Sequence, residues 1–232
     1  MANDAFMRVS ESVEGRTPYY PVFLALSNRK VLVVGGGSIA ERKVTSLVQA
    51  GARVCVVSPE VTPRLEEWAG EGCIELKRRV FDSGDIQGMF LVYAATNDAA
   101  VNEAVYVKAE SCGILVNVVD DPPHCNFIVP SVARRGLLQM AVSTSGAAPA
   151  LAKRVRRELE ERYSDEWEDY VNLLAEVREL VRLYIPGNEA ERASVLEAAC
   201  DLALLERIRA GVHLEAETVY REAAAIAAGD LR

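Results

Sequence analysis

The sequence predicts an α/β protein in which strands and helices alternate and a parallel sheet is covered on both faces. Short apolar, β-branched runs recur through the first 130 residues. Helix-forming segments separate these runs, and the runs are continuously apolar instead of alternating with polar residues. Continuous apolar strands are typical of buried parallel sheets. The 232 residues suffice for one such domain and a smaller helical part.

The expected strands end at glycine, proline or polar residues. They span residues 31–34, 53–57, 74–80, 90–95 and 114–119. A helix is expected over 39–50, where Gly51 ends it. A second helix is expected to begin near Ala99, because the preceding Thr96-Asn97-Asp98 offers capping side chains. Strands and helices at this spacing imply βαβ units.

The pattern changes after Pro130. Residues 137–143 are predicted to form one more strand and 150–163 a helix. Ser164 is expected to cap a following helix, Asn188 with Glu191 resembles a capping box, and a last helix is expected over 215–228. The predicted divisions are a flexible tail (1–17), an α/β domain (18–130), a connecting segment (131–162) and an all-helical domain (163–232).

The first predicted helix of that last domain carries an apolar stripe at helical spacing. Its members are Trp167, Tyr170, Val171, Leu174, Val177, Val181 and Tyr184. We favour the interpretation that these side chains form a core over the alternative that the aromatic ones form an exposed surface.

Composition excludes several classes of protein. A net charge of −8 argues against general nucleic-acid binding. The five cysteines include no CxxC pair, which argues against a disulfide framework or a zinc site. Neither a signal peptide nor a membrane-spanning run is recognisable. The sequence therefore predicts a cytoplasmic protein with reduced thiols, no membrane association and no resident metal.

A glycine-rich turn follows the first predicted strand. Residues 35–40, Gly-Gly-Gly-Ser-Ile-Ala, fit the pattern G-x-G-x-x-A. Gly35 permits a tight turn, Gly37 lets the backbone approach a pyrophosphate, and Ala40 lets the helix pack closely on the strand. The start of the helix, at Ser38 and Ile39, offers free N–H groups to phosphates. Because the turn lies between a strand and a helix, we predict a Rossmann-type dinucleotide site that includes Gly36; a tight turn alone is the alternative.

The end of the second predicted strand departs from the usual pattern. The acidic residue that normally binds the adenosine ribose is replaced by Ser58, followed by Pro59-Glu60. We expect all three to line the cofactor site. Because no arginine stands there to receive a 2′-phosphate, NAD is predicted in preference to NADP, although Arg53 and Arg64 are nearby in sequence.

Polar residues also end two further strands. Thr96 and Asn97 are expected beside the nicotinamide half of the cofactor, with helix capping as the alternative. Asp120 is the candidate catalytic residue, because a carboxylate at a strand end can accept a proton. Its alternative is a turn-forming role before Pro122, which is the role assigned to Asp121.

A series of segments resembles the siroheme-synthesis family of precorrin-2 dehydrogenases and sirohydrochlorin ferrochelatases. The segments occur in the family's order over about residues 19–160. They are Tyr19–Phe23, VVGGGSIAERK at 33–43, GARVCVVSPE at 51–60, AATND at 94–98, NVVDDPPHCNFIVPS at 117–131 and AVSTSGAAPALAKRVR at 141–156. Asn126 and Ser145 depart from the family's usual aspartate and glycine, and the chain beyond about Gly211 has no recognisable match.

The resemblance implies a fold, a reaction and partners. It implies a homodimer with a Rossmann NAD-binding domain, a dimerisation segment over 131–162 and a C-terminal helical domain. It implies NAD-dependent oxidation of precorrin-2, a tetrapyrrole with many carboxylates, to sirohydrochlorin. Some members also insert a ferrous ion, and a cobalt ion is an alternative metal substrate. The family's key acid corresponds to Asp120.

Substrate-binding residues are expected in two places. Asn117 and His124 flank Asp120, although a loop histidine beside prolines is more often merely solvated. Residues 143–146 (Ser143, Thr144, Ser145 and Gly146) precede a helix carrying Lys153, and hydroxyls with cations suit a substrate rich in carboxylates. The cations of this helix can instead pair with its own glutamates. A non-catalytic, NAD-responsive regulator remains the alternative from another class.

Overall fold

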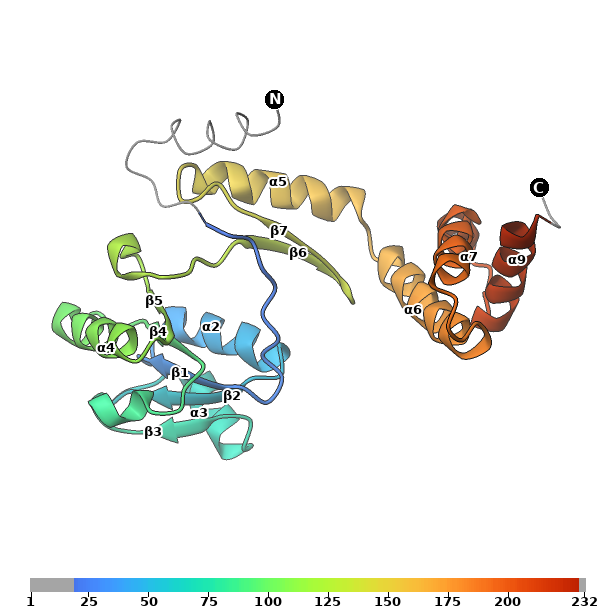
Figure 1. Ribbon diagram of the computed structural model, residues 1–232. Helices are drawn as coiled ribbons and strands as arrows, with labels where there is room; N and C mark the ends of the chain where they lie inside the picture. The colour runs from blue at the N-terminus through green and yellow to red at the C-terminus, as the bar shows by residue number, and fades with distance from the viewer. Residues whose placement is uncertain (1–18, 230–232) are drawn as a thin grey trace, which may run out of the picture. The chain divides into compact units, whose positions relative to one another are not determined.

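The computed structural model describes residues 19–229, so the predicted tail at 1–17 lies outside the described residues. The described chain divides into two compact units that meet between Val129 and Pro130. The first unit is a five-stranded parallel sheet with helices on both faces (Figure 1). Its strands are β1 (Lys30–Val34), β2 (Arg53–Val57), β3 (Glu75–Lys77), β4 (Leu91–Ala94) and β5 (Leu115–Val118), in the spatial order β3-β2-β1-β4-β5. The predicted Rossmann-type α/β class is thus confirmed.

The sheet has a separate core on each face. On one face, the helices α2 (Ser38–Gln49) and α3 (Pro63–Gly70) pack over alternate residues of β1, β2 and β4. On the other, α4 (Ala99–Ser111) packs with the 3-10 helix η1 (Ser83–Ile86). The four residues Val31–Val34 are at most 2% exposed, as a strand covered on both faces requires.

The register aligns the carboxyl ends of three strands. Val34 of β1 lies opposite Val57 of β2 and Ala94 of β4. The segments that leave these strands therefore emerge at one edge of the sheet, where open α/β folds place ligands. The turn after β1, the segment after β2 and the segment after β4 all lie there.

The third strand is shorter than predicted, because its expected last residues turn away to form ion pairs. Arg78 contacts Glu66, and Arg79 binds both carboxylate oxygens of Asp85 at 2.6 and 2.7 Å. Lys77 reaches the same carboxylate at 3.2 Å. Asp85, which is 5% exposed, thereby ties η1 to the end of β3.

This cluster predicts an acid-sensitive contribution to stability. The hydrogen bond from Arg79, followed by those from Asp82 and Lys77, lowers the pKa of Asp85 from 3.8 to about 2. Because the pKa is lowered, the contribution is present above 3.8 and is lost as pH falls through about 2. We expect Asp85→Asn to reduce the free energy of unfolding at neutral pH by about 2 kcal/mol. Urea denaturation from neutral to acid pH measures this loss.

Glu67→Gln is the matched control, because Glu67 pairs with Arg64 where both side chains are about half exposed. Its effect on the free energy of unfolding is expected to stay below about 1 kcal/mol. An Asp85→Asn effect as small as this, or one that grows toward acid pH, contradicts the stabilising role of Asp85.

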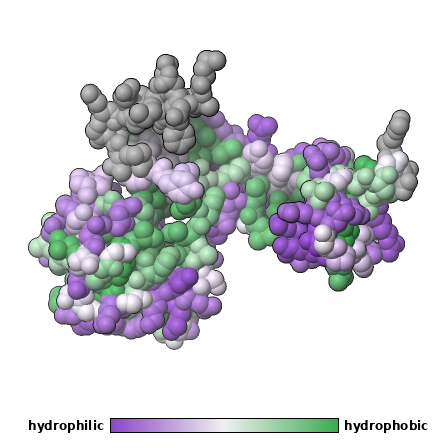
Figure 2. Space-filling view, viewed as in Figure 1, coloured by the Kyte–Doolittle hydropathy of each residue, from purple (hydrophilic) through white to green (hydrophobic). Residues whose placement is uncertain are grey.

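The second unit contains a hairpin, a long helix and a helical cluster. The strands β6 (Ser131–Arg135) and β7 (Leu138–Val142) pair antiparallel, and α5 (Pro149–Arg162) packs on them. The helices α6 (Glu166–Tyr184), α7 (Glu189–Asp201), α8 (Leu204–Arg209) and α9 (Ala216–Ala228) follow. Their shared core includes Leu173, Val177, Val181, Val195 and Val219. Hydrophilic residues dominate the face of these helices visible in Figure 2.

Several details of this unit differ from prediction. The residue immediately before α6 is Asp165, not Ser164, and the Asp165 side chain makes no capping hydrogen bond. Asn188 caps α7 as expected, accepting from the Glu191 N–H. Leu173 belongs to the buried stripe of α6, whereas Tyr184 is 51% exposed. No helix in the described chain is long and apolar enough to cross a membrane.

Candidate functional site

The glycine turn after β1 is built by close backbone packing. Gly35 has φ +121°, a conformation that L side chains rarely adopt, and an added Cβ there would overlap the Ala95 carbonyl. A Cβ on Gly36 would overlap the Glu60 carbonyl and lie 2.7 Å from Val61 Cγ1. By contrast, a Cβ on Gly37 would have no neighbour within 4 Å. Gly35 and Gly36 thus shape the turn, while Gly37 leaves room in front of α2.

That room opens into a cleft of about 680 Å³ at the carboxyl edge of the sheet. The turns after β1, β2 and β4 contribute Gly35, Gly36, Gly37, Ser58, Pro59, Glu60, Thr96 and Asn97. Other lining residues, absent from the sequence prediction, include Val61, Thr62, Val80 and Phe81. Val61 and Thr62 directly follow the predicted Glu60, whereas Val80 and Phe81 belong to no motif and only the fold brings them to the cleft. Ser38 and Ile39 form the first turn of α2 beside it.

Two polar side chains of the cleft already make hydrogen bonds within the protein. The Ser58 hydroxyl, 8% exposed as a residue, donates to the Glu60 carbonyl at 2.6 Å. Thr96 Oγ1 donates to Asn102 Oδ1 of α4 at 2.8 Å and accepts from the Asp98 N–H at 3.1 Å. Asp98, not Thr96 or Asn97, caps α4 by accepting from the N–H groups of Ala100 and Val101. Asn97 is exposed and makes none of these bonds.

The turn after β5 presents the candidate acid. Asp120 is exposed and has φ +60°, a left-handed conformation that is uncommon outside glycine but is tolerated by Asp and Asn. Cys125 secures this turn, since its Sγ lies 3.1 Å from the Val118 carbonyl oxygen and 3.2 Å from that of Asp121. Asn117 contributes from β5 by donating to the Phe127 carbonyl at 3.0 Å.

His124 lies in a bracket of carboxylates after this turn. Its Nδ1 is 2.7 Å from Asp121 Oδ2, and its Nε2 is 3.0 Å from Glu103 Oε2. Its ring meets the Tyr106 ring edge-on, with centroids 4.6 Å apart. The hydrogen bond with Asp121 raises the pKa of His124 above 6.5, against a lowering by partial burial. His124, the last residue of the 3-10 helix η2 (Pro122–His124), is therefore engaged with Asp121 and with Glu103 of α4 instead of being merely solvated, and Asp121 does more than form the turn.

We expect this bracket to stabilise the fold more at acid than at alkaline pH. Because the folded-state pKa is raised, the contribution is complete below 6.5 and is lost as pH rises through the higher folded value. Urea denaturation should show a larger difference between wild type and His124→Gln near about pH 5.5 than near about pH 9. In NMR titrations, Asp121→Asn should lower the His124 pKa toward 6.5. An unchanged His124 pKa in that variant contradicts the assignment.

The remaining predicted residues lie in the second unit. Ser143 Oγ accepts from the Ser145 N–H at 3.0 Å, and Thr144 Oγ1 accepts from the Ala148 N–H at 3.0 Å. Ser145 and Gly146 have φ values of +50° and +78°. This turn leads into α5, where Lys153 is exposed. Its neighbours Arg154 and Arg156 pair with Glu158 and Glu160, as the alternative interpretation expected.

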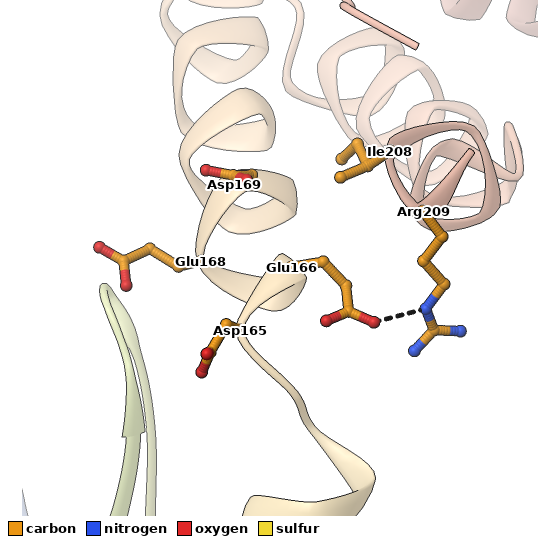
Figure 3. Close-up of a pocket in the computed structure, with 6 residues that line it drawn as sticks. All are labelled: Asp165, Glu166, Glu168, Asp169, Ile208 and Arg209. Atoms are coloured by element: carbon orange, nitrogen blue, oxygen red, sulfur yellow. Dashed lines mark hydrogen bonds and ion pairs between the residues drawn. The ribbon is translucent and has the colours of Figure 1, made fainter. Parts of the chain in front are cut away.

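A second cavity lies at the start of α6 and is lined by four acids. Glu166 binds Arg209 at 2.7 Å, which lowers the pKa of Glu166 to about 2, whereas Asp165, Glu168 and Asp169 point away from Arg209 (Figure 3). Among residues 19–229, no group of three or more His, Cys, Asp or Glu side chains is placed to hold a metal ion. The Glu166–Arg209 pair ties α6 to α8.

The parallel sheet, the glycine turn and the open space at Gly37 define a Rossmann-type dinucleotide-binding protein. Residues 22–131 match the family model described as putative NAD(P)-binding. Residues 135–162 match the model described as sirohaem biosynthesis protein central.

Similar proteins agree with these matches. A siroheme synthase from Nitrosococcus oceani is 40% identical over 86% of this chain and 42% of its own length. One from Methylococcus capsulatus is 41% identical over 90% of this chain and 44% of its own length. The chain thus spans less than half of these relatives. The solved structure of SirC, a precorrin-2 dehydrogenase, matches with a TM-score of 0.73 and 32% identity, covering 91% of this chain and all of that chain. The chain belongs to the siroheme-synthesis family of precorrin-2 dehydrogenases.

Proposed function

We propose that this protein oxidises precorrin-2 to sirohydrochlorin with NAD as the oxidant. The observation that carries the proposal is the match to a precorrin-2 dehydrogenase over the whole of that enzyme, combined with a glycine turn open at Gly37. The siroheme synthases support the same pathway through the part of their length that this chain spans. We place the enzyme in the cytoplasm, where its five free cysteines would stay reduced.

NAD, and not NADP, is the proposed cofactor, and the positions of the nearby arginines support this choice. Arg53 begins β2, so it lies at the opposite end of the strand from Ser58. Arg64 is occupied by Glu67 and by the Trp68 ring, 4.8 Å from its guanidinium. Arg79, close to Ser58 through the end of β3, is held by Asp85. Because these cations are distant or paired, the 2′-phosphate of NADP would gain little binding energy from them. We therefore expect kcat/KM to be higher with NAD than with NADP.

Different residues are proposed to bind the cofactor and the substrate. Gly35–Gly37 and the start of α2 bind the pyrophosphate, with Ser58, Pro59, Glu60, Thr96 and Asn97 lining the rest of the cofactor site. NAD, when bound, would be the acceptor of the hydride. Asp120 accepts the accompanying proton from the macrocycle, so that one hydride and one proton leave the substrate. Asn117 and His124 flank the substrate, and Ser143–Gly146 with Lys153 receive its carboxylates.

The protein is proposed to act as a homodimer through the segment 131–162. A two-stranded hairpin is marginally stable by itself, and within its own unit β6–β7 is covered mainly by α5, with a smaller contact from α6. Leu137 and Leu151 of this segment are 64% and 51% exposed. Light scattering with size-exclusion chromatography tests this: a monomer at micromolar concentration contradicts it.

Anaerobic absorbance spectroscopy tests the activity. Precorrin-2 with the protein and NAD should give the sirohydrochlorin spectrum, and omission of NAD should prevent the change. Subsequent addition of ferrous or cobalt ions, against a protein-free control, tests insertion of the metal substrate, in which Asp120 would take up pyrrole protons. Binding of NAD with no change in precorrin-2 over hours contradicts the dehydrogenase and favours an NAD-responsive regulator.

A further inference from the structure

Lys43 stands in an unusual environment on α2. It lies on the same side of the helix as Ala40, Val44 and Leu47, the residues that pack on the sheet. Its ammonium sits over the ring of Tyr93, with Nζ 5.3 Å from the ring centroid. Tyr93 is 6% exposed and belongs to β4, so its ring is a fixed platform. The cation is therefore held in one place instead of moving freely in water.

Within the described part of the chain, this cation has no ionic partner of its own. None of the ion pairs among residues 19–229 includes Lys43, whereas many of the surface arginines in that range are paired. Burial lowers the pKa of Lys43, and Arg42 acts in the same direction, while the charge of Asp120 opposes the shift. A half-buried ammonium without a bound anion is costly, so a ligand carboxylate here would be stabilising.

Lys43 also faces the part of the sheet that carries the candidate acid. Tyr93 lies opposite Asn117 in the register of β4 and β5, and Phe127 packs edge-on against Tyr93 with centroids 5.5 Å apart. Asp120 follows β5, the edge strand of the sheet, and lies within electrostatic reach of Lys43. Both α2 and β5 belong to the first unit. Lys43 and Asp120 thus lie near one another toward the carboxyl ends of β4 and β5.

We propose that Lys43 binds a carboxylate of the tetrapyrrole substrate and thereby fixes the macrocycle beside Asp120. The inference rests on the proposed function and deepens it by naming a residue that recognises the substrate. Arginine at this position keeps the charge, whereas methionine keeps the apolar stem over Tyr93 and removes only the charge. The role predicts an effect on tetrapyrrole binding that is separate from NAD binding.

Steady-state kinetics and direct binding of sirohydrochlorin and NAD test the proposal on the full chain. Lys43→Met should raise KM for precorrin-2 and Kd for sirohydrochlorin by about 10- to 100-fold, with Kd for NAD within about twofold of wild type. Lys43→Arg should recover most of the loss. Lys108→Met is the matched control, because Lys108 is an exposed lysine in the last turn of α4, on the other face of the sheet.

Three results overturn the proposal. An unchanged KM and sirohydrochlorin Kd in Lys43→Met shows that Lys43 does not bind the substrate. A weakened NAD affinity in both Lys43→Met and Lys43→Gln assigns the residue to the cofactor or to the fold instead. If wild-type protein neither binds sirohydrochlorin nor oxidises precorrin-2, the proposed function itself fails. If wild-type protein does both and Lys43→Met behaves in the same way, only the proposed role of Lys43 is refuted.

Discussion

Replacement of Asp120 by asparagine is expected to reduce kcat for precorrin-2 oxidation by about a thousandfold, the loss typical of a missing general base. Asparagine has nearly the same shape and tolerates the left-handed conformation that Asp120 adopts at φ +60°. The variant therefore loses the proton acceptor while keeping the turn after β5. Anaerobic stopped-flow absorbance measures the rate, and Kd for NAD should remain at the wild-type value.

Asp120→Ala separates charge from backbone strain. Alanine also lacks the carboxylate, so its kcat should fall as far as that of Asp120→Asn. Because alanine adopts positive φ less readily, its free energy of unfolding should be about 1 kcal/mol lower than that of the asparagine variant. If Asp120→Asn retains a rate within about tenfold of wild type, Asp120 is not the proton acceptor.

The strands of the parallel sheet were predictable because their signal is local and strong. Arg53–Val57 was predicted to the residue, since four consecutive apolar side chains are buried on both faces. The strand Ser131–Arg135 was missed because its residues are mostly polar or small, and it is stabilised by pairing with β7. The helix Pro63–Gly70 was also missed: it buries only Leu65 fully, too little to give a helical period.

The candidate site was predictable to the extent that strand ends were. Residues 35–37, 58–60 and 96–97 meet in one cleft because parallel strands in register bring their carboxyl ends to one edge. Contacts that join distant segments carried no sequence signal. The approach of Gly36 to Glu60 depends on how two strand-end segments pack together. The His124–Glu103 pair and the contact of Lys43 with Tyr93 depend on how helices pack on the sheet.

Substitutions in the glycine turn are also expected to have large effects. Alanine variants at the neighbouring positions Gly36 and Gly37 should be impaired for different reasons. An alanine at 37 meets no atom of the protein within 4 Å, and its backbone has no need of positive φ. Gly37→Ala should therefore fold with a free energy of unfolding within about 0.5 kcal/mol of wild type. Its methyl group would fill the space through which the pyrophosphate approaches the backbone. We expect Kd for NAD to rise by about 10- to 100-fold, as isothermal titration calorimetry can measure.

Gly36→Ala is the matched comparison, because its methyl group would overlap the Glu60 carbonyl and crowd Val61. The segment after β2 must move, which should lower the free energy of unfolding by about 2 kcal/mol even without NAD. Thermal denaturation of both apo variants distinguishes the two positions. If Gly37→Ala is destabilised like Gly36→Ala, the space at Gly37 is structural. If Gly37→Ala binds NAD normally, the pyrophosphate lies elsewhere, because a dinucleotide in the proposed place cannot share that space with a methyl group.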